Sequence, residues 1–277
     1  MKKKTLIRAG LLAVVVTLMT PSAKAATIAA HFDDVIMGFH ATGGQGQNDN
    51  LEVDLGSVSQ FHNAAPGTSF AIPGLAVADL VSIYGANWNT RSDLLWGAVA
   101  TAGRSAAGPD GEPKITLWAS NAETTLGVQS TPWNRGSTFA QGPASAIIEP
   151  MFNTGNPPNA GQLDGATSTA NSNFAADINA TLAGSWSKQD LAQAGTSFKY
   201  FNPSVDGSLN IGPSGQARLD FYELQPGTGP GAYLGYFSLN GDGTSSFTAV
   251  PEPSTVWSLG LGLGLVMMGV RRRHAKA

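Results

Sequence analysis

Glycine and proline interrupt the chain so often that its body has no room for long helices. The 277 residues include 34 Gly and 16 Pro, and the apolar runs between them are short. Both residue types favour turns and destabilise helix interiors, so a helical bundle or a coiled coil is not expected. The complete absence of cysteine also excludes a disulfide scaffold, a thiolate zinc site and a cysteine nucleophile.

Several of the short runs have the pattern of β-strands. Apolar and polar side chains alternate over residues 35–40 and 51–55, which is typical of half-buried strands. Residues 94–101 and 115–119 are more continuously apolar and indicate buried strands. In the C-terminal third we expect two hairpins, because Asn-Gly and Asp-Gly pairs readily supply the positive φ of tight turns. These hairpins join residues 208–211 to 216–224 through the turn 212–215, and residues 233–239 to 244–250 through the turn 240–243.

Two segments have helical spacing. Val77, Leu80, Val81 and Tyr84 follow the i, i+3, i+4, i+7 pattern and predict a short helix over residues 77–84. Residues 144–152 also fit the helical period, although Pro150 interrupts it. The Asn-, Gly- and Pro-rich residues 153–172 predict a long loop. The fold class expected is an antiparallel β-sandwich or jelly-roll-like domain with one or two short helices.

The N-terminus is typical of a secretory signal peptide. Basic residues at 2–4 precede an apolar run at 9–19, and the small residues Ala23 and Ala25 mark the cleavage site. We therefore expect residues 1–25 to be removed by the general secretion machinery and residues 26–250 to form one exported domain.

The C-terminus, residues 251–277, combines three elements. Pro251, Glu252 and Pro253 precede an apolar stretch that ends at Val270, and Arg271, Arg272 and Arg273 follow it. As a helix, the 17 residues from Ser254 to Val270 rise about 25 Å, which is slightly less than the bilayer core of about 30 Å. Because basic clusters stay cytoplasmic, both ends predict that the body between them is exported.

This tripartite tail resembles the PEP-CTERM sorting signal of Gram-negative bacteria. The resemblance implies that exosortase, a membrane-embedded enzyme similar to cysteine transpeptidases, recognises the tail and processes it near Pro251–Glu252–Pro253. The body is similar to one recurrent group of PEP-CTERM carriers, a similarity that implies no established activity. The segments that carry it are residues 34–39, 41–44, 51–56, 84–88, 93–94, 96–97, 220–224 and 233–235, together with Arg91.

The expected mature body is strongly acidic. Residues 26–250 hold seven Lys and Arg against 18 Asp and Glu, a net charge of −11 that the whole-chain value of −3 conceals. Nucleic-acid binding depends on neutralising phosphates with basic side chains, so no nucleic-acid partner is expected. Docking to an anionic polysaccharide is also disfavoured unless a divalent cation bridges the two.

No motif of catalysis or metal binding stands out. His31, His40 and His62 lack the spacing of metalloprotease or deaminase motifs, and we interpret them as ordinary structural or surface residues. We expect no catalytic residue, no metal and no cofactor. The alternative is Ca²⁺ at Asp33 and Asp34, since carboxylate and carbonyl oxygens are its preferred ligands.

Tryptophan side chains are the other candidates for binding a ligand. Trp88, Trp133 and Trp186 have polar flanks and are candidates for stacking on sugars, whereas Trp96 and Trp118 lie in apolar strands and are expected in the core. The main hypothesis is a non-catalytic cell-surface or extracellular-matrix protein associated with exopolysaccharide or biofilm. The alternatives are a carbohydrate-binding module of β-sandwich type and a secreted polysaccharide hydrolase.

Overall fold

The computed structural model describes most of the expected mature body. The described residues are 32–72, 74–152, 167–168, 175–181, 184–191, 196–213 and 215–250. The predicted signal peptide, the sorting tail and His31 lie outside them, as does the predicted loop 153–172 apart from residues 167–168.

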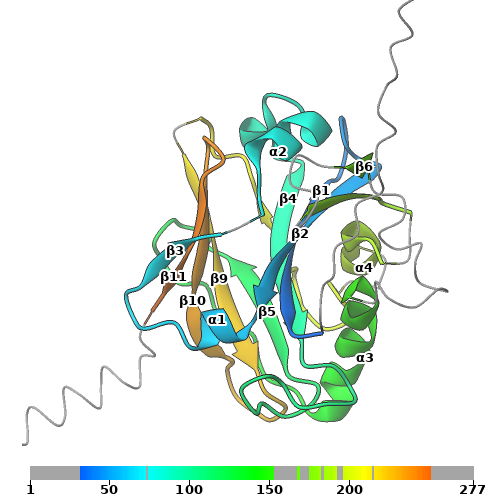
Figure 1. The fold of residues 1–277 in the computed structure, drawn as a ribbon, viewed down its shortest axis with the longest axis vertical. Helices are drawn as coiled ribbons and strands as arrows, with labels where there is room; N and C mark the ends of the chain where they lie inside the picture. Colours follow the sequence, from blue (N-terminus) through cyan, green and yellow to red (C-terminus); the bar gives the residue numbers. More distant parts are fainter. Residues whose placement is uncertain are drawn as a thin grey trace, which may run out of the picture.

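The described strands form one continuous antiparallel sheet that curves around its own inner face (Figure 1). β8 (Gly207–Ser208) pairs separately with β4. The prediction of a mainly antiparallel β fold with few short helices is confirmed. Along the sheet the order is β3 (Ser69–Ala71), β11 (Ser245–Ala249), β10 (Ala232–Asn240), β9 (Gln216–Leu224), β5 (Leu117–Ala122), β4 (Leu94–Thr101), β1 (Asp34–Ala41), β2 (Asp49–Ser57), β7 (Ala175–Asn179) and β6 (Thr167–Ser168).

The arrangement differs from the two separate sheets of the predicted sandwich. β5 pairs with β4 on one side and with β9 on the other, so it connects the two halves into a single hydrogen-bonded sheet. The predicted hairpin of residues 240–243 is confirmed as β10 and β11, but the predicted pairing of residues 208–211 with 216–224 is wrong. Because β5 and β10 occupy both edges of β9, no edge remains for residues 208–211.

The helices are short and lie at the ends or on the outer face of the sheet. α1 (Ser59–His62) follows β2, and α2 (Val77–Tyr84) confirms the helix predicted there. α3 (Thr138–Ile148) is followed by the 3-10 helix η2 (Glu149–Phe152), so the α-helix ends before Pro150, the residue at which the interruption was predicted. η1 (Trp88–Thr90) and α4 (Trp186–Leu191) complete the set. Among the described residues, no helix has the length and apolar character needed to cross a bilayer.

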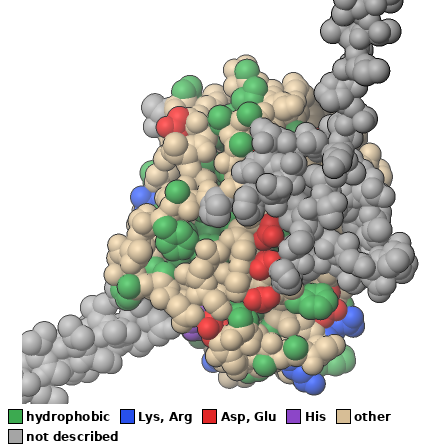
Figure 2. Space-filling model, viewed as in Figure 1, with side chains coloured by type: hydrophobic (Ala, Val, Ile, Leu, Met, Phe, Trp, Pro, Cys, Tyr) green, Lys and Arg blue, Asp and Glu red, His purple; other side chains and the backbone are tan. Residues whose placement is uncertain are grey.

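Acidic side chains are prominent on the surface. On the face shown in Figure 2 they form a short row near the middle, whereas Lys and Arg lie towards the edges.

The large exposed apolar side chains of the described residues come from several separate elements. They are Phe32, Val77, Val81, Leu126, Val128 and Phe139.

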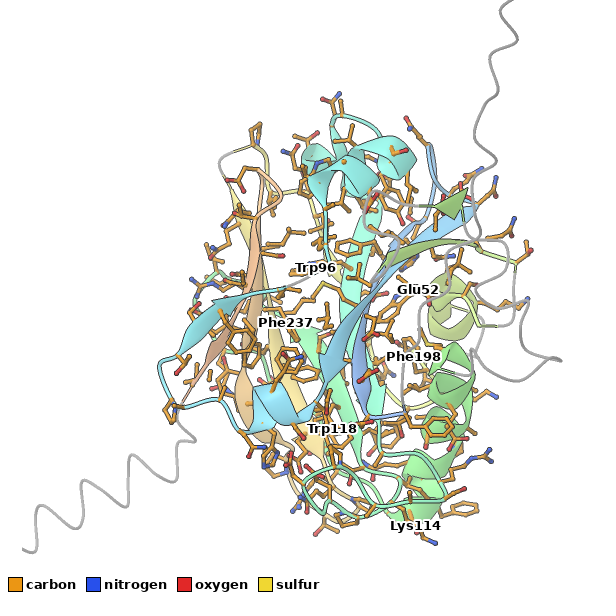
Figure 3. All side chains as sticks on the ribbon, in the orientation of Figure 1. Glu52, Trp96, Lys114, Trp118, Phe198 and Phe237 are labelled. Atoms are coloured by element: carbon orange, nitrogen blue, oxygen red, sulfur yellow. The ribbon has the colours of Figure 1, made fainter. Side chains whose placement is uncertain are left out.

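Each face of the sheet has its own hydrophobic core. The inner face packs Phe39 and Trp96 with Phe237 from the far half of the sheet, and Trp118 belongs to the same cluster (Figure 3). The predicted core positions of Trp96 and Trp118 are therefore confirmed. The outer face carries a second cluster that α3 and α4 cover. Both faces of β1 are consequently buried, although its alternation predicted a half-buried strand.

Candidate functional site

The three tryptophans predicted to stack on sugars are all buried. Trp88 is 2% exposed, Trp133 8% and Trp186 0%. The Nε1 of Trp133 donates to the carbonyl of Ser120 at 2.8 Å, and its ring packs against Phe201. Sugar stacking needs an open ring face, so the prediction that these residues form a stacking surface is wrong. The prediction rested on polar residues next to these tryptophans in the sequence, but such neighbours do not determine the direction of the indole side chain.

Trp186 instead fills the outer face of the sheet. Gly38 of β1 and Gly97 of β4 pair directly across the two strands. A Cβ atom at Gly38 would lie 2.0 Å from Cδ2 of Trp186, and one at Gly97 would lie 2.8 Å from its Cζ2. The glycine pair thus makes a flat floor that admits the indole, and Phe198 packs edge-on against the same ring at 5.1 Å between centroids.

Polar side chains surround this indole, and we call His40, Asn50, Glu52, Trp186 and Asp206 the outer-face polar group. The Trp186 backbone amide donates to Glu52 at 2.6 Å, and its Nε1 donates to Asp206 at 3.1 Å. The other oxygen of Asp206 lies 2.9 Å from His40 Nε2. Asn50 accepts from the next amide of α4, so β2 holds the first turn of this helix.

The side chains of this group are closed to solvent. Burial raises the pKa of the Glu52 carboxyl to about 8, and the hydrogen bond from the Trp186 amide opposes that rise only in part. The His40 and Asp206 side chains are each 1% exposed. A His–Asp pair is one half of many nucleophile-activating arrangements, but a substrate in solvent does not reach a pair this deeply buried. Its effect here is to position Trp186 and α4.

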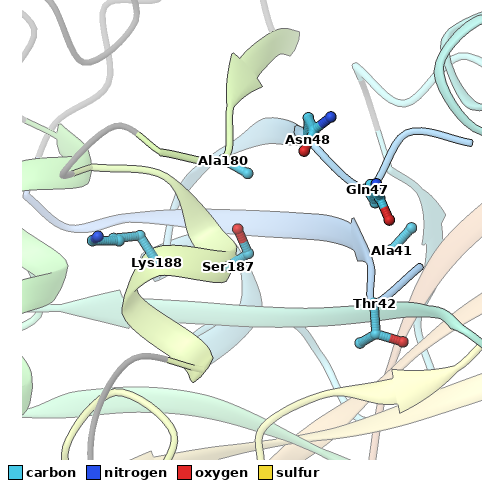
Figure 4. Close-up of a pocket in the computed structure, with 7 residues that line it drawn as sticks. All are labelled: Ala41, Thr42, Gln47, Asn48, Ala180, Ser187 and Lys188. Carbon is cyan, nitrogen blue, oxygen red and sulfur yellow. The ribbon is translucent and has the colours of Figure 1, made fainter. Parts of the chain in front are cut away.

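An open pocket of about 370 Å³ lies beside the outer-face polar group (Figure 4). Arg91 braces one wall, because its guanidinium donates to the carbonyls of Gly43 and Gln45 and pairs with Asp93 at 2.7 Å. Small and neutral polar side chains dominate the lining, so the pocket lacks the converging charged and aromatic groups of a specific ligand site. The lining residues are Ala41, Thr42, Gln47, Asn48, Ala180, Ser187 and Lys188.

Asp33 and Asp34, the predicted alternative for Ca²⁺, lie at the beginning of β1. Asp33 is already engaged, since its carboxylate accepts from the Ser57 hydroxyl at 2.8 Å. Asp34 is buried. Among the described residues, the group of three or more metal-ligating side chains lies elsewhere.

That group consists of His62, Glu112 and Glu223. His62 ends α1, Glu112 lies in the connection between β4 and β5, and Glu223 belongs to β9. His62 Nδ1 lies 2.8 Å from a Glu223 oxygen and 3.6 Å from a Glu112 oxygen. The imidazole is 33% exposed, whereas the two carboxylates are 4% and 2% exposed. Three segments distant in the sequence therefore present one nitrogen and two carboxylate oxygens at a single point.

The same geometry bears on the hydrolase alternative. Glycoside hydrolysis needs two carboxylates that face an open substrate cleft. Glu112 and Glu223 approach each other, but they lie beneath the surface with His62 against them. Their burial is unlike the arrangement of two carboxylates on either side of an open sugar-binding cleft.

Sequence reasoning missed this cluster because its members share no local motif. One local signal was present in Pro109-Asp110-Gly111, a turn-forming triplet directly before Glu112. The Gly111 amide donates to the carbonyl of Gly108, and the Gly108 amide donates to that of Glu112. A turn that closes on itself in this way holds its last side chain in a defined direction.

Comparison with known proteins identifies the tail. The family model of the PEP-CTERM protein-sorting motif matches residues 249–273. The matched segment includes the Pro251–Glu252–Pro253 triplet, the apolar stretch and the three arginines, so the predicted sorting signal is confirmed. This motif implies export and exosortase-mediated processing. Neither the curated proteins nor the solved structures gave a match to the chain.

Proposed function

We propose that this PEP-CTERM protein is a non-catalytic component of the cell surface or extracellular matrix that associates with exopolysaccharide. The observation that carries the proposal is the sorting motif at residues 249–273, whose presence makes the chain a substrate of exosortase. The signal-peptide pattern at residues 1–25 supports the same route. In this account the tail holds the exported body at the membrane until processing releases it.

The negative charge of the exported domain limits how it can bind the exopolysaccharide. A net charge of −11 repels an anionic polysaccharide, so association requires neutral sugar, divalent cations or a second protein. We therefore expect the association to depend on divalent cations when the polymer is acidic.

Cell fractionation tests this function. The change is the triple substitution Pro251→Ala, Glu252→Ala and Pro253→Ala, made in the full chain in its native cells. The unchanged chain should collect in the polymer-rich surface fraction, whereas the variant should stay in the inner membrane, because processing near the triplet is lost. Immunoblots of membrane, surface and medium fractions provide the measurement.

A matched control and a second strain make the outcome decisive. Ser258→Ala alters the tail outside the triplet and should leave the distribution unchanged. In cells that make no exopolysaccharide, the unchanged chain should move from the surface fraction to the medium. An identical distribution with and without exopolysaccharide would refute the polymer association.

A further inference from the structure

We propose that His62, Glu112 and Glu223 form a binding site for one divalent transition-metal cation of the zinc type. The site lies at the end of the sheet where α1, the connection between β4 and β5, and β9 meet. It is distinct from the sorting tail and from the outer-face polar group. The inference does not depend on the function proposed above.

In each carboxylate, the oxygen that lies away from His62 accepts a hydrogen bond that orients the group. Oε2 of Glu112 accepts from the Asp110 amide at 2.9 Å, and Oε1 of Glu223 accepts from the Gln225 side chain at 2.7 Å. The remaining oxygen of each therefore turns towards His62 Nδ1. Such outer hydrogen bonds fix the direction of metal ligands in known sites.

One of these inward oxygens has no hydrogen-bond donor. Oε1 of Glu112 is buried without a hydrogen-bond partner, and it lies 3.6 Å from His62 Nδ1. A buried acceptor left in this way is unfavourable, and the nearby Glu223 carboxylate adds repulsion. A cation at the centre of the three groups would bind the unpartnered oxygen and neutralise the repulsion between the two carboxylates.

The spacing and the donor set select the kind of metal. With bonds of about 2.1 Å, a tetrahedral ion places neighbouring ligand atoms about 3.4 Å apart. The 3.6 Å separation between His62 and Glu112 is close to this value, and the 2.8 Å separation between His62 and Glu223 must widen by about 0.6 Å. An imidazole nitrogen favours Zn²⁺ over Mg²⁺ and Ca²⁺, which prefer oxygen. Two carboxylates and a neutral imidazole balance the charge of a divalent ion, and the partly exposed His62 provides the entry side.

Calorimetric titration of the full chain with ZnCl₂ tests the site. The protein is purified in detergent without a polyhistidine tag, treated with a chelator and then titrated. We expect one Zn²⁺ per chain, and we expect His62→Ala and Glu223→Gln each to weaken binding at least about tenfold. His62 is partly exposed and Glu223→Gln preserves the side-chain shape, so both variants should fold. A thermal melt without Zn²⁺ checks this, and a second melt with Zn²⁺ should stabilise the unchanged chain more than either of these two variants.

Asp110→Asn is the matched control. Asp110 stands in the same turn as Glu112, but its oxygens accept from Ser59 and Asn63, so this substitution removes the same charge without removing a ligand. Its Zn²⁺ affinity should equal that of the unchanged chain. Failure of the unchanged chain to bind Zn²⁺ at millimolar concentration would overturn the proposal. So would equal binding by His62→Ala, or Ca²⁺ binding as tight as that of Zn²⁺.

Discussion

Replacement of Trp186 by alanine is expected to lower the free energy of unfolding by about 3–5 kcal/mol. The indole is fully buried, it covers the Gly38–Gly97 pair, and its Nε1 donates to a buried oxygen of Asp206. Truncation leaves a cavity that the two glycines cannot fill, and it removes a donor from a buried carboxylate. Urea denaturation followed by circular dichroism measures the change.

Two controls separate packing from hydrogen bonding. Trp186→Phe retains a ring over the glycine floor but loses the Nε1 donor, so its cost should fall between zero and that of alanine. Phe139→Ala removes an aromatic ring that is 91% exposed and should change stability by no more than about 0.5 kcal/mol. A Trp186→Ala protein as stable as the unchanged chain would mean that the indole lies at the surface, as the stacking hypothesis required.

The protein is expected to become less stable as the pH rises from about 4.5 to about 8. Burial raises the pKa of Glu52 to about 8 in the folded state from an ordinary value of 4.5, so the folded chain holds a proton that the unfolded chain releases. The stabilisation is complete below pH 4.5 and is lost as the pH passes the folded-state pKa. A shift of this size corresponds to a loss on the order of 5 kcal/mol, at about 1.4 kcal/mol per pH unit. Burial also raises the pKa of Asp177, to about 6, which adds to the slope in the same direction.

Glu52→Gln isolates the contribution of Glu52. Glutamine keeps an oxygen that accepts from the Trp186 amide but does not titrate, so the variant should show a shallower pH dependence and exceed the unchanged chain in stability above pH 8. Urea midpoints between pH 5 and pH 9 measure both slopes. Equal slopes for the two proteins would show that the Glu52 carboxyl titrates normally.

The sequence correctly predicted the helix and the hairpin that depend on interactions between residues close together in the chain. The helix over residues 77–84 follows from apolar spacing, and the hairpin of β10 and β11 follows from its Asn-Gly and Asp-Gly turn. The strand at residues 94–101 is apolar as far as Ala100 because both of its faces are buried. The order of strands in the sheet depends on which distant edges meet, so the pairing of β5 with β9 was not predictable from either strand alone.

Buried polar side chains were predicted least well from the sequence. Glu52 and His40 occupy the polar positions of alternating strands, which ordinarily face water, yet Trp186 and α4 cover them. Their burial was invisible because the covering segment lies far along the chain. For the same reason His62 appeared to be an isolated histidine until the fold brought Glu112 and Glu223 to it.

The intact mass of the protein recovered from native cells tests the proposed processing most directly. We expect a surface or released species that begins near Ala26 and ends near Val250, and we expect this species to disappear in cells without exosortase. A species that keeps Arg271–Arg273 in every fraction, with or without exosortase, would contradict processing and would make the tail a permanent membrane anchor.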